Sequence, residues 1–382
     1  MTLTVRPIES SGKDFRSFVE FPYQLNRHVE NWVPNLKSDV IKLFDRSKNP
    51  FFEHAEVQAF VAERPEGKGA RIVGRIAAIE NRLHNEIHED RVGFFGFFDC
   101  EEDPEAAMAL FEAAGAWLSE RGFDTMRGPV NFSTNDDCGL LIQGFHRPPA
   151  ILMPFNPPYY EKLVEAAGFT KAKDLFAFYH EGQAPDFLRR AGERVKRRSG
   201  ATTRGMDMSR FAQEVDLIRD LYNGAWEKNW GFIPLTQHEV DHLARELKPV
   251  VDPNLVRFVE VDGETVGFTL SLPDLNQVLT HLDGRLGPWG MVKYLWYSKK
   301  INMLRTLTLG VKESHRSMGL DSLLYLDLYD YGNRRGIHRG EFSWVLEDNL
   351  TMCKPLERIG ASVDRVYRIY DRPLTPNLEF LP

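Results

Sequence analysis

The apolar and polar positions of the chain follow the same order twice. In the first half, Ala55–Arg64 alternates apolar and polar residues as a half-buried strand does, and Arg71–Arg82 follows a turn as its hairpin partner. Val92–Cys100 is almost continuously apolar, which is typical of a buried strand. Pro104 then opens a predicted helix to Ser119, because proline is favoured in the first helical turn. Three further elements are expected: a strand near Met126–Asn131, a short helix at Pro157–Ala167 and a strand near Asp174–Tyr179.

The second half repeats this order. Asp262–Glu264 is a turn between two alternating segments, Leu255–Val261 and Thr265–Leu272, and predicts a second hairpin. We then expect a buried strand at Leu304–Val311 and a long helix with an apolar stripe at Met318–Arg335. A strand at Glu341–Leu346, a short helix at Leu350–Ile359 and a last strand at Val363–Tyr370 follow. Two unrelated α+β domains could share such an order, but agreement over six elements favours a duplication. We therefore expect a mixed α/β fold with two domains, residues 1–185 and 186–382.

Composition narrows the functional classes. A chain of 382 residues with 42% hydrophobic and 27% charged residues fits two globular domains. Its net charge of -7 argues against a dedicated nucleic-acid-binding protein, because phosphates favour a strongly positive surface. Three scattered cysteines predict neither a zinc site nor disulfides, and they fit a reducing compartment. The first residues lack a secretion signal and no apolar run reaches about 18 residues, so we expect a cytoplasmic protein, or one resting on the inner face of the inner membrane.

A basic segment, Asp186–Arg204, connects the two halves. Six of its cations lie within ten residues: Arg189, Arg190, Arg194, Lys196, Arg197 and Arg198. One interpretation is a solvated linker or helix surface. The other is an anchor for anionic lipid headgroups or for a phosphate of coenzyme A, since each cation near an anionic surface contributes about 1 kcal/mol.

The most informative motif for chemistry is Gly310–Ser322, where a buried strand ends, a polar loop turns and a helix is expected to begin at about Ser317–Gly319. The first amides of a helix have no partners inside it and lie at the positive end of its dipole, so they suit a pyrophosphate. Gly319 would let the backbone approach the phosphates, and Arg316 could add a charge-assisted contact. The motif therefore predicts an anion site.

Arg316-Ser317-Met318-Gly319-Leu320-Asp321 resembles the Q/R-x-x-G-x-G/A signature of the GNAT acyltransferases, with Asp321 in place of the final Gly or Ala. The resemblance implies that these six residues bind the pyrophosphate of acyl-CoA, and that a backbone amide near Leu309–Val311 polarises the thioester carbonyl. Trp344–Asn349 and the following helix to Gly360 resemble the second motif of the family, which implies that Asn349 packs against the cofactor arm. The usual general-acid tyrosine falls near Leu356 here, so it is missing.

The first half resembles the same fold without the phosphate loop. The equivalent stretch, Asp99–Pro104, is acidic and would repel a pyrophosphate. Arg127–Gly139 is a long polar connection that is either functional or a turn that caps its neighbours.

Whole stretches, including Asn49–Ala55, Val92–Phe98 and Arg127–Gly139, are similar to a bacterial family of tandem GNAT proteins that includes the bacterial ceramide synthases. This resemblance implies two tandem GNAT-like domains, with the acyl-CoA site in the second. It further implies an N-acyltransferase that joins a fatty acyl group to a long-chain amine. The donor would be acyl-CoA or an acyl carrier protein, with no metal or prosthetic group.

Amide formation requires a base for the attacking amine and a donor for the thioester oxygen. The base candidates are Glu347, at the end of a predicted strand, and Asp136 and Asp137 from the first half. Each of the three also fits a structural role. His54, His146 and His315 are weaker candidates of the same kind.

An insertion at Pro273–Met303 separates the second hairpin from its buried strand. It contains a dense group of aromatic and aliphatic residues, Trp289, Met291, Val292, Tyr294, Leu295, Trp296 and Tyr297, followed by Lys299 and Lys300. Aromatics beside lysines fit an element at a membrane interface or a cover over an acyl chain. An added helical pair packed on the core is the alternative.

Two other functions compete with acyl-CoA-dependent N-acylation. A Fem-type transferase, which is also a tandem GNAT fold, would use aminoacyl-tRNA, but the phosphate loop and the acidic net charge argue against it. A non-catalytic lipid-binding or coenzyme-A-binding protein is supported by the missing tyrosine.

Overall fold

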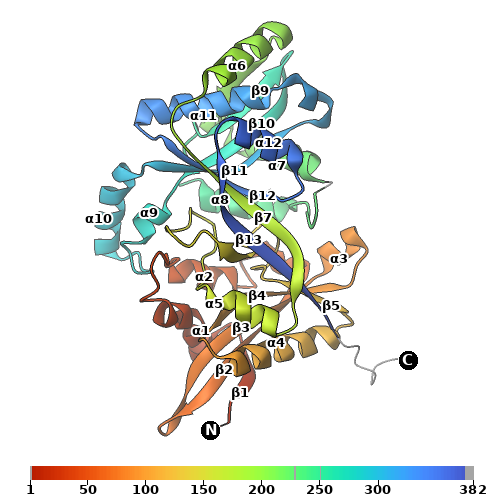
Figure 1. The fold of residues 1–382 in the computed structure, drawn as a ribbon, viewed down its shortest axis with the longest axis vertical. Helices are drawn as coiled ribbons and strands as arrows, with labels where there is room; N and C mark the ends of the chain where they lie inside the picture. The colour runs from red at the N-terminus through yellow and green to blue at the C-terminus, as the bar shows by residue number, and fades with distance from the viewer. Residues whose placement is uncertain (1, 228, 250, 375–382) are drawn as a thin grey trace. The chain divides into compact units, whose positions relative to one another are not determined.

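The computed structural model describes residues 2–227, 229–249 and 251–374. They form two compact units (Figure 1). In its described part, unit 1 contains residues 2–175, 279–294 and 365–374, and unit 2 contains Phe176–Val278 and Leu295–Asp364, apart from residues 228 and 250. The chain thus crosses between the units several times, rather than once at the expected boundary of 185/186.

Unit 1 is built on a sheet with the order β1-β2-β3-β4-β5-β13. Its strands are β1 (Thr4–Ile8), β2 (Ala55–Glu66), β3 (Gly69–Asn81), β4 (Val92–Cys100), β5 (Thr125–Gly128) and β13 (Ser362–Pro373), with β6 (Leu140–Gln143) beside β13. Its helices are α1 (Gly12–Leu25), α2 (Lys37–Leu43), η1 (Pro50–Glu53), α3 (Arg82–His88), α4 (Pro104–Ser119) and α5 (Tyr159–Ala166). The predicted bounds of β4 and α4 are confirmed to the residue.

The core of unit 1 lies between the sheet and α4. Leu110, Phe111 and Ala114 of α4 are fully buried and pack with Phe95 of β4. The helix begins where the sequence indicates, because the Asp103 side chain accepts a hydrogen bond from the Ala106 N–H (3.1 Å) and Pro104 follows directly.

Unit 2 contains the order β12-β11-β10-β9-β8, with the second part of β7 beside β12. The strands are β7 (Thr170–Glu181), β8 (Thr202–Gly205), β9 (Val256–Val261), β10 (Glu264–Pro273), β11 (Met303–Val311) and β12 (Arg339–Leu346). The helical segments are α6 (Asp186–Ser199), η2 (Met208–Arg210), α7 (Phe211–Trp226), α8 (Gln237–Leu247), α9 (Asn276–Leu279), η3 (Ser298–Lys300), η4 (Glu313–Met318), α11 (Asp321–Arg335) and α12 (Leu350–Arg358). The helix α10 (Pro288–Tyr297) begins in unit 1 and ends in unit 2. Buried leucines of α11 form the centre of its core.

The last strand does not stay with the second half. β13 pairs antiparallel with β5, from Tyr370–Gly128 to Pro373–Thr125, and with β6, so it completes the sheet of unit 1. The strand expected at Val363–Tyr370 is confirmed, but most of it belongs to unit 1 and not to a domain of residues 186–382.

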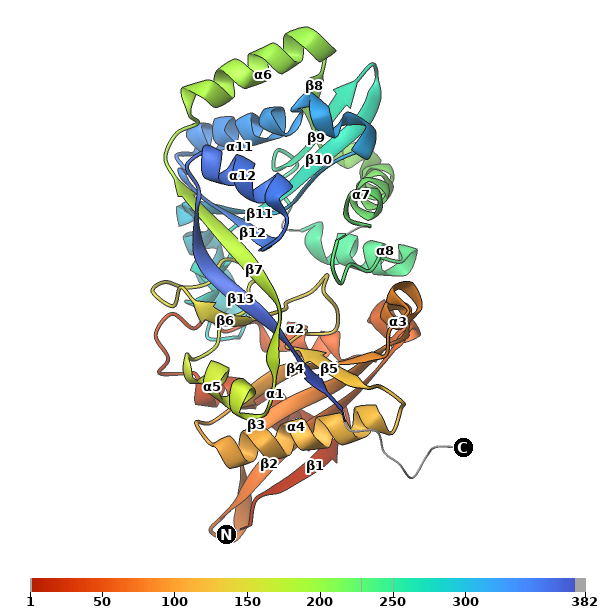
Figure 2. The same ribbon diagram turned by 45° about the vertical axis from the view of Figure 1, so that its right-hand side comes forward.

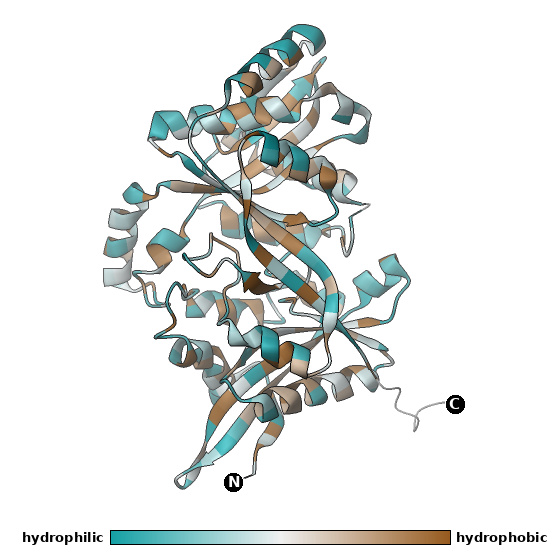
Figure 3. Cartoon of the chain, viewed as in Figure 1, coloured by the Kyte–Doolittle hydropathy of each residue, from teal (hydrophilic) through white to brown (hydrophobic). Residues whose placement is uncertain are grey.

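The basic segment is a helix and not an extended linker. Leu188 and Gly192 of α6 face inward, and a Cβ on Gly192 would lie 2.3 Å from Leu326 of α11, so the two helices are in close contact (Figure 2). The six cations lie on the polar side of this helix, which is largely teal in Figure 3. Only Arg189 has an ion pair within the described residues, with Asp330 at 3.4 Å.

Candidate active site on β11 and α11

The site of interest in unit 2 begins where β11 and β12 stop pairing. Their parallel pairing covers only Met303–Thr306 with Arg339–Phe342, although β11 continues to Val311 and β12 to Leu346. On its other side β11 remains paired with β10, with a register shift that leaves Leu307 unmatched. We call Leu307–Val311 the β11 edge.

The register shows which backbone groups of the β11 edge point away from β10. The Lys312 N–H donates to the Val266 carbonyl (2.8 Å), and pairing is regular from Val311 back to Thr308. Because alternate residues of a strand direct their N–H groups to opposite sides, the N–H groups of Leu309 and Val311 point away from β10. A ligand carbonyl at the β11 edge would therefore find the Leu309 N–H as a donor.

The predicted phosphate loop follows directly. Glu313–Met318 forms the 3-10 helix η4, and α11 starts at Asp321, a few residues later than the expected Ser317–Gly319. Gly319 joins them with φ +72°, a left-handed conformation that favours glycine; a Cβ there would meet Val195 of α6 at an ordinary 3.5 Å. The Ser322 and Leu323 N–H groups donate to the carbonyls of Gly319 and Leu320, so an anion would be bound by the amides before Ser322.

Arg316 is tied to this loop. Its Nε donates to the Val311 carbonyl (3.2 Å) and its Nη2 to the Ala225 carbonyl at the end of α7 (2.9 Å). The exposed guanidinium keeps further N–H donors for an anion, because arginine carries five. Ser317 is exposed and Met318 half-buried beside it.

Asp321, which replaces the small residue of the signature, starts α11 from a half-buried position. Burial raises the pKa of its carboxyl above the usual value, while backbone N–H groups of Ser322 and Asp321 act in the opposite direction. A carboxyl with a raised pKa carries its negative charge less readily than an exposed one.

Unit 1 contains the same strand arrangement, but its edge is occupied. β4 pairs in parallel with β5 only at Val92–Phe94, and the chain then returns to bond with β4 itself. The Val130 N–H donates to the Phe95 carbonyl (2.8 Å), and the Asn131 side-chain oxygen accepts from the Phe97 N–H (2.7 Å). Phe97 lies three residues beyond the last paired residue of β4, as Leu309 does on β11.

Asn131 therefore holds, in unit 1, the position that a ligand carbonyl would take on the β11 edge. A Cβ on Gly96 would lie 2.2 Å from the Val130 carbonyl oxygen, so the segment is packed against the strand without space. This contact gives Arg127–Gly139 a structural role.

Comparison with known proteins shows which family the chain belongs to. No family model matches the chain. The chain is 39% identical over 381 residues to the bacterial ceramide synthase of Caulobacter vibrioides, covering 97% of this chain and 98% of that protein, and 34% identical to protein YghO of Escherichia coli, covering 94% and 93%. The chain belongs to the tandem GNAT-fold family that includes this ceramide synthase.

Solved structures show the same fold. A tandem GNAT protein from the clavulanic acid biosynthesis pathway superimposes with a TM-score of 0.58 over 98% of this chain and 100% of that chain, at 12% identity. A GCN5-related N-acetyltransferase from Sphaerobacter thermophilus gives 0.53 over 98% and 97%, also at 12%. Together with the family membership shown by the 39% identical relative, this fold makes the chain an acyltransferase.

The catalytic candidates of this family member fall in different units. Glu347 follows β12 in unit 2 and is half-buried. Asn349, two residues on, accepts a hydrogen bond from the Met352 N–H (3.3 Å) and caps α12, a role that the sequence did not indicate. Asp136 and Asp137 lie in unit 1, where Asp136 accepts from the Ser133 hydroxyl (2.7 Å) and the Asp137 carbonyl accepts from the Asn131 N–H.

The three histidines have ordinary surroundings. His54 Nδ1 lies 3.2 Å from the Asn81 side-chain oxygen, and His315 Nδ1 lies 2.8 Å from the Ser314 hydroxyl. His146 is in a turn after β6. Within the described residues, no three His, Cys, Asp or Glu side chains gather closely enough to hold a metal ion.

A buried polar network that the sequence did not reveal marks the point where β11 and β12 part. The Arg305 guanidinium donates from Nε to the Ser343 hydroxyl (2.9 Å) and from Nη2 to the Ser343 carbonyl (3.1 Å), and this hydroxyl donates to Glu341 (2.8 Å). All three are at least 95% buried. The sequence contained one sign of this network, the charged Arg305 inside a mostly apolar strand. Its partners lie on β12, and the register between β11 and β12 cannot be predicted from sequence.

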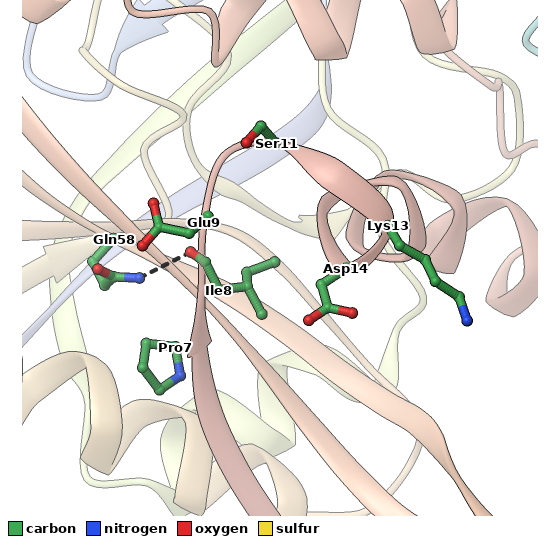
Figure 4. A pocket seen from close by; sticks show the side chains of 7 residues that line it. All are labelled: Pro7, Ile8, Glu9, Ser11, Lys13, Asp14 and Gln58. Carbon is green, nitrogen blue, oxygen red and sulfur yellow. Dashed lines mark hydrogen bonds between the residues drawn. The ribbon is translucent and has the colours of Figure 1, made fainter.

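A separate pocket of about 480 Å³ lies in unit 1, far along the chain from the predicted site residues (Figure 4). Its lining consists of Pro7, Ile8, Glu9, Ser11, Lys13, Asp14 and Gln58, and Gln58 donates to the Ile8 carbonyl at 3.0 Å. None of the predicted site residues lines it, and nothing in its chemistry suggests a reaction.

Proposed function

We propose that the protein transfers a long-chain acyl group from acyl-CoA to the primary amine of a sphingoid-type lipid. One observation carries the location of the site: the β11 edge continues into the Arg316–Gly319 loop, whereas the equivalent edge of unit 1 is occupied by Asn131. The lipid acceptor is supported by the relative that is 39% identical over nearly the whole chain.

In this proposal the pyrophosphate of acyl-CoA binds at the start of α11. Arg316 supplies a charge-assisted contact and the amides at Gly319 and Leu320 point to the anion, with Ser317, Met318 and Asp321 completing the loop. The thioester oxygen accepts a hydrogen bond from the Leu309 N–H, with the neighbouring Val311 N–H on the same side of the strand.

The reaction itself needs no redox step. The neutral amine nitrogen attacks the thioester carbonyl carbon, a tetrahedral intermediate forms, and the C–S bond breaks as the amide forms. The amine loses one proton to a base, and the departing thiolate takes up one proton. We assign the base to Glu347, because it directly follows the strand beside the β11 edge; Asp136 and Asp137 are the alternatives from unit 1, and Asn349 would support the Glu347 turn.

The occupied edge in unit 1 implies one acyl-CoA site per chain. Asn131 and Val130 already bond to the two β4 groups that a thioester and its arm would use. The acidic stretch at Asp99–Pro104 lies where a phosphate loop would be needed.

The experiment is thiol release from a series of acyl-CoAs, from acetyl to palmitoyl, with and without sphinganine or 3-ketosphinganine, with the N-acyl product identified by mass spectrometry. We expect amine-dependent release with long chains only. Release with short chains and polar amines would retain the acyltransferase and contradict the lipid acceptor. Release only from acyl carrier protein, or from aminoacyl-tRNA, would contradict acyl-CoA as the donor.

A further inference from the structure

The helix α10 (Pro288–Tyr297) presents apolar side chains to solvent. None of its residues is buried, and four of them have exposed fractions above one half: Trp289 (82%), Trp296 (63%), Leu295 (59%) and Val292 (57%). Of the helical pair that the alternative placed on the core, α9 is packed with Val278 buried, whereas α10 leaves its apolar side exposed. A contiguous exposed apolar surface on a folded protein usually marks an interaction site.

These side chains share one side of α10. Successive helical residues are about 100° apart, so Trp289, Met291, Val292, Leu295 and Trp296 form one continuous arc of about 160°. Met291 is exposed as well. Gly290, Tyr294 and Tyr297, which are half-buried, lie on the opposite side. The usual pattern of a surface helix is thus inverted, with the apolar side outward.

The segment before α10 is anchored in unit 1 by specific contacts. The apolar side chains of α10 are therefore exposed on an ordered element and not on an unanchored segment. Gly284 has φ +69°, its carbonyl accepts from the Lys37 N–H (3.0 Å), and a Cβ there would lie 2.4 Å from the Tyr23 ring. Further along, Lys293 donates to the His281 carbonyl (3.0 Å). The apolar arc therefore belongs to a fixed element, the helix labelled α10 in Figure 1.

The charged residues within the segment 284–302, which includes α10, have one sign. From Gly284 to Asn302 the chain carries Arg285, Lys293, Lys299 and Lys300 and no acidic residue, although the whole protein has a net charge of -7. Lys300 lies over the Trp296 and Tyr297 rings, 4.9 and 5.4 Å from their centroids. Exposed tryptophans bordered by lysines are the composition of helices that lie in a bilayer interface.

We propose that α10 docks the protein on an anionic lipid surface, with its Trp289–Trp296 arc inserted among the lipids and its lysines at the headgroups. Ten residues span about 15 Å, half of the roughly 30 Å hydrocarbon thickness, so the helix lies in the plane of the interface. Separately, no helix in the described residues is long and apolar enough to cross a membrane.

A second copy of the chain fits this arc less well than lipid does. Two such segments would bring like charges together, and one face of a ten-residue helix covers far less than the roughly 800 Å² per partner of a stable interface. The proposal concerns α10 alone and holds whichever amine the enzyme acylates.

The test is co-sedimentation of the full chain with vesicles of phosphatidylglycerol and phosphatidylethanolamine, and with vesicles of phosphatidylcholine alone. We expect binding to the anionic vesicles that weakens as salt is added. The W289S/W296S double variant should lose at least tenfold in partitioning, and K299E/K300E should lose binding to the anionic vesicles. The control is L243S/I41S, which removes two exposed apolar side chains elsewhere (Leu243 on α8 and Ile41 on α2) and should bind like wild type.

All variants change exposed side chains, so circular dichroism and the melting temperature should match wild type. Failure of the wild type to bind any vesicle overturns the proposal. Equal binding by W289S/W296S overturns it too, because the lipid surface would then lie elsewhere. Self-association that W289S/W296S abolishes, without vesicle binding, would assign the arc to a second copy and also overturn it.

Discussion

Arg127 donates two hydrogen bonds to Asp371, from Nε to one carboxylate oxygen and from Nη2 to the other, both at 2.8 Å. Arg127 lies on β5 and Asp371 on β13, and they are matched residues in the strand register although they are 244 positions apart. The pair is mostly buried. It fastens the last strand of the chain to the sheet of unit 1.

Replacing Arg127 by alanine should therefore destabilise unit 1. The change leaves a partly buried carboxylate without its two donors, and we expect the free energy of unfolding to fall by about 2 kcal/mol. Urea denaturation followed by circular dichroism measures this. The control is Arg189→Ala, which breaks an exposed ion pair with Asp330 at 3.4 Å and should cost about 0.5 kcal/mol or less. Equal effects of the two changes would contradict the fastening role.

Gly319→Glu should abolish acyl-CoA binding while the protein stays folded. The substitution places a side chain and a negative charge where the pyrophosphate is proposed to bind, and we expect the Kd to rise at least tenfold, or about 1.4 kcal/mol. Isothermal titration calorimetry with coenzyme A measures this Kd. Gly336→Glu is the matched control, because Gly336 at the other end of α11 has nearly the same backbone, φ +69°, and open space around it. Unchanged affinity in Gly319→Glu would remove the proposed site.

Asn131→Leu should lower stability without changing the number of acyl-CoA molecules bound. The substitution removes the acceptor of the Phe97 N–H, and leaving that group unpaired costs about 1–3 kcal/mol. Binding of a non-hydrolysable acyl-CoA analogue should give one site per chain in both proteins. Two sites in the wild type would show that unit 1 is not closed by its own chain.

Stability should fall in acid through His84. This side chain is 1% exposed, and burial, followed by the charges of His88 and Arg127, lowers its pKa to about 3. The unfolded chain takes up the proton near pH 6.5 and the folded protein does not, so stability is lost as pH falls from about 6.5 towards 3, by up to about 1.4 kcal/mol per pH unit.

The measurement for this histidine is the free energy of unfolding at pH 7, 6, 5 and 4. In His84→Leu the free energy of unfolding should fall less steeply with decreasing pH than in wild type, because unfolding then takes up one proton fewer. His28→Leu, which changes an exposed histidine of the same unit, should keep the wild-type slope. A wild-type slope in His84→Leu would contradict the assignment.

Sequence patterns predicted the elements whose signal is local. β4 is a continuous apolar run, and α4 carries both an Asp103 cap and Pro104, so their bounds could be predicted to the residue. The turn at Arg316–Gly319 between β11 and α11 could also be predicted, since it depends on its neighbours in sequence. The helix α11 begins a few residues later than the pattern predicts, because the polar residues before it form the 3-10 helix η4.

What could not be predicted depends on partners far along the chain. Periodicity identifies β13 as a strand but not the sheet it joins. The Arg305–Ser343–Glu341 network and the bond from Asn131 to Phe97 appear only once the register is fixed. The exposure of Trp289 and Trp296 was equally hidden, because the same apolar residues could have been a core helix.

The pairing of β13 with the sheet of unit 1 also has a consequence for biosynthesis. Ribosomes add about 5–20 residues per second, so roughly 10–50 seconds separate the emergence of Arg127 from that of Asp371, 244 positions later. Until then β5 is paired only with β4, and the apolar surface that meets Tyr370 has no cover. Unit 1, although most of it is translated first, can finish folding only after all of unit 2 has been made, and a nascent chain that stops before β13 would present this unfinished sheet to chaperones and proteases.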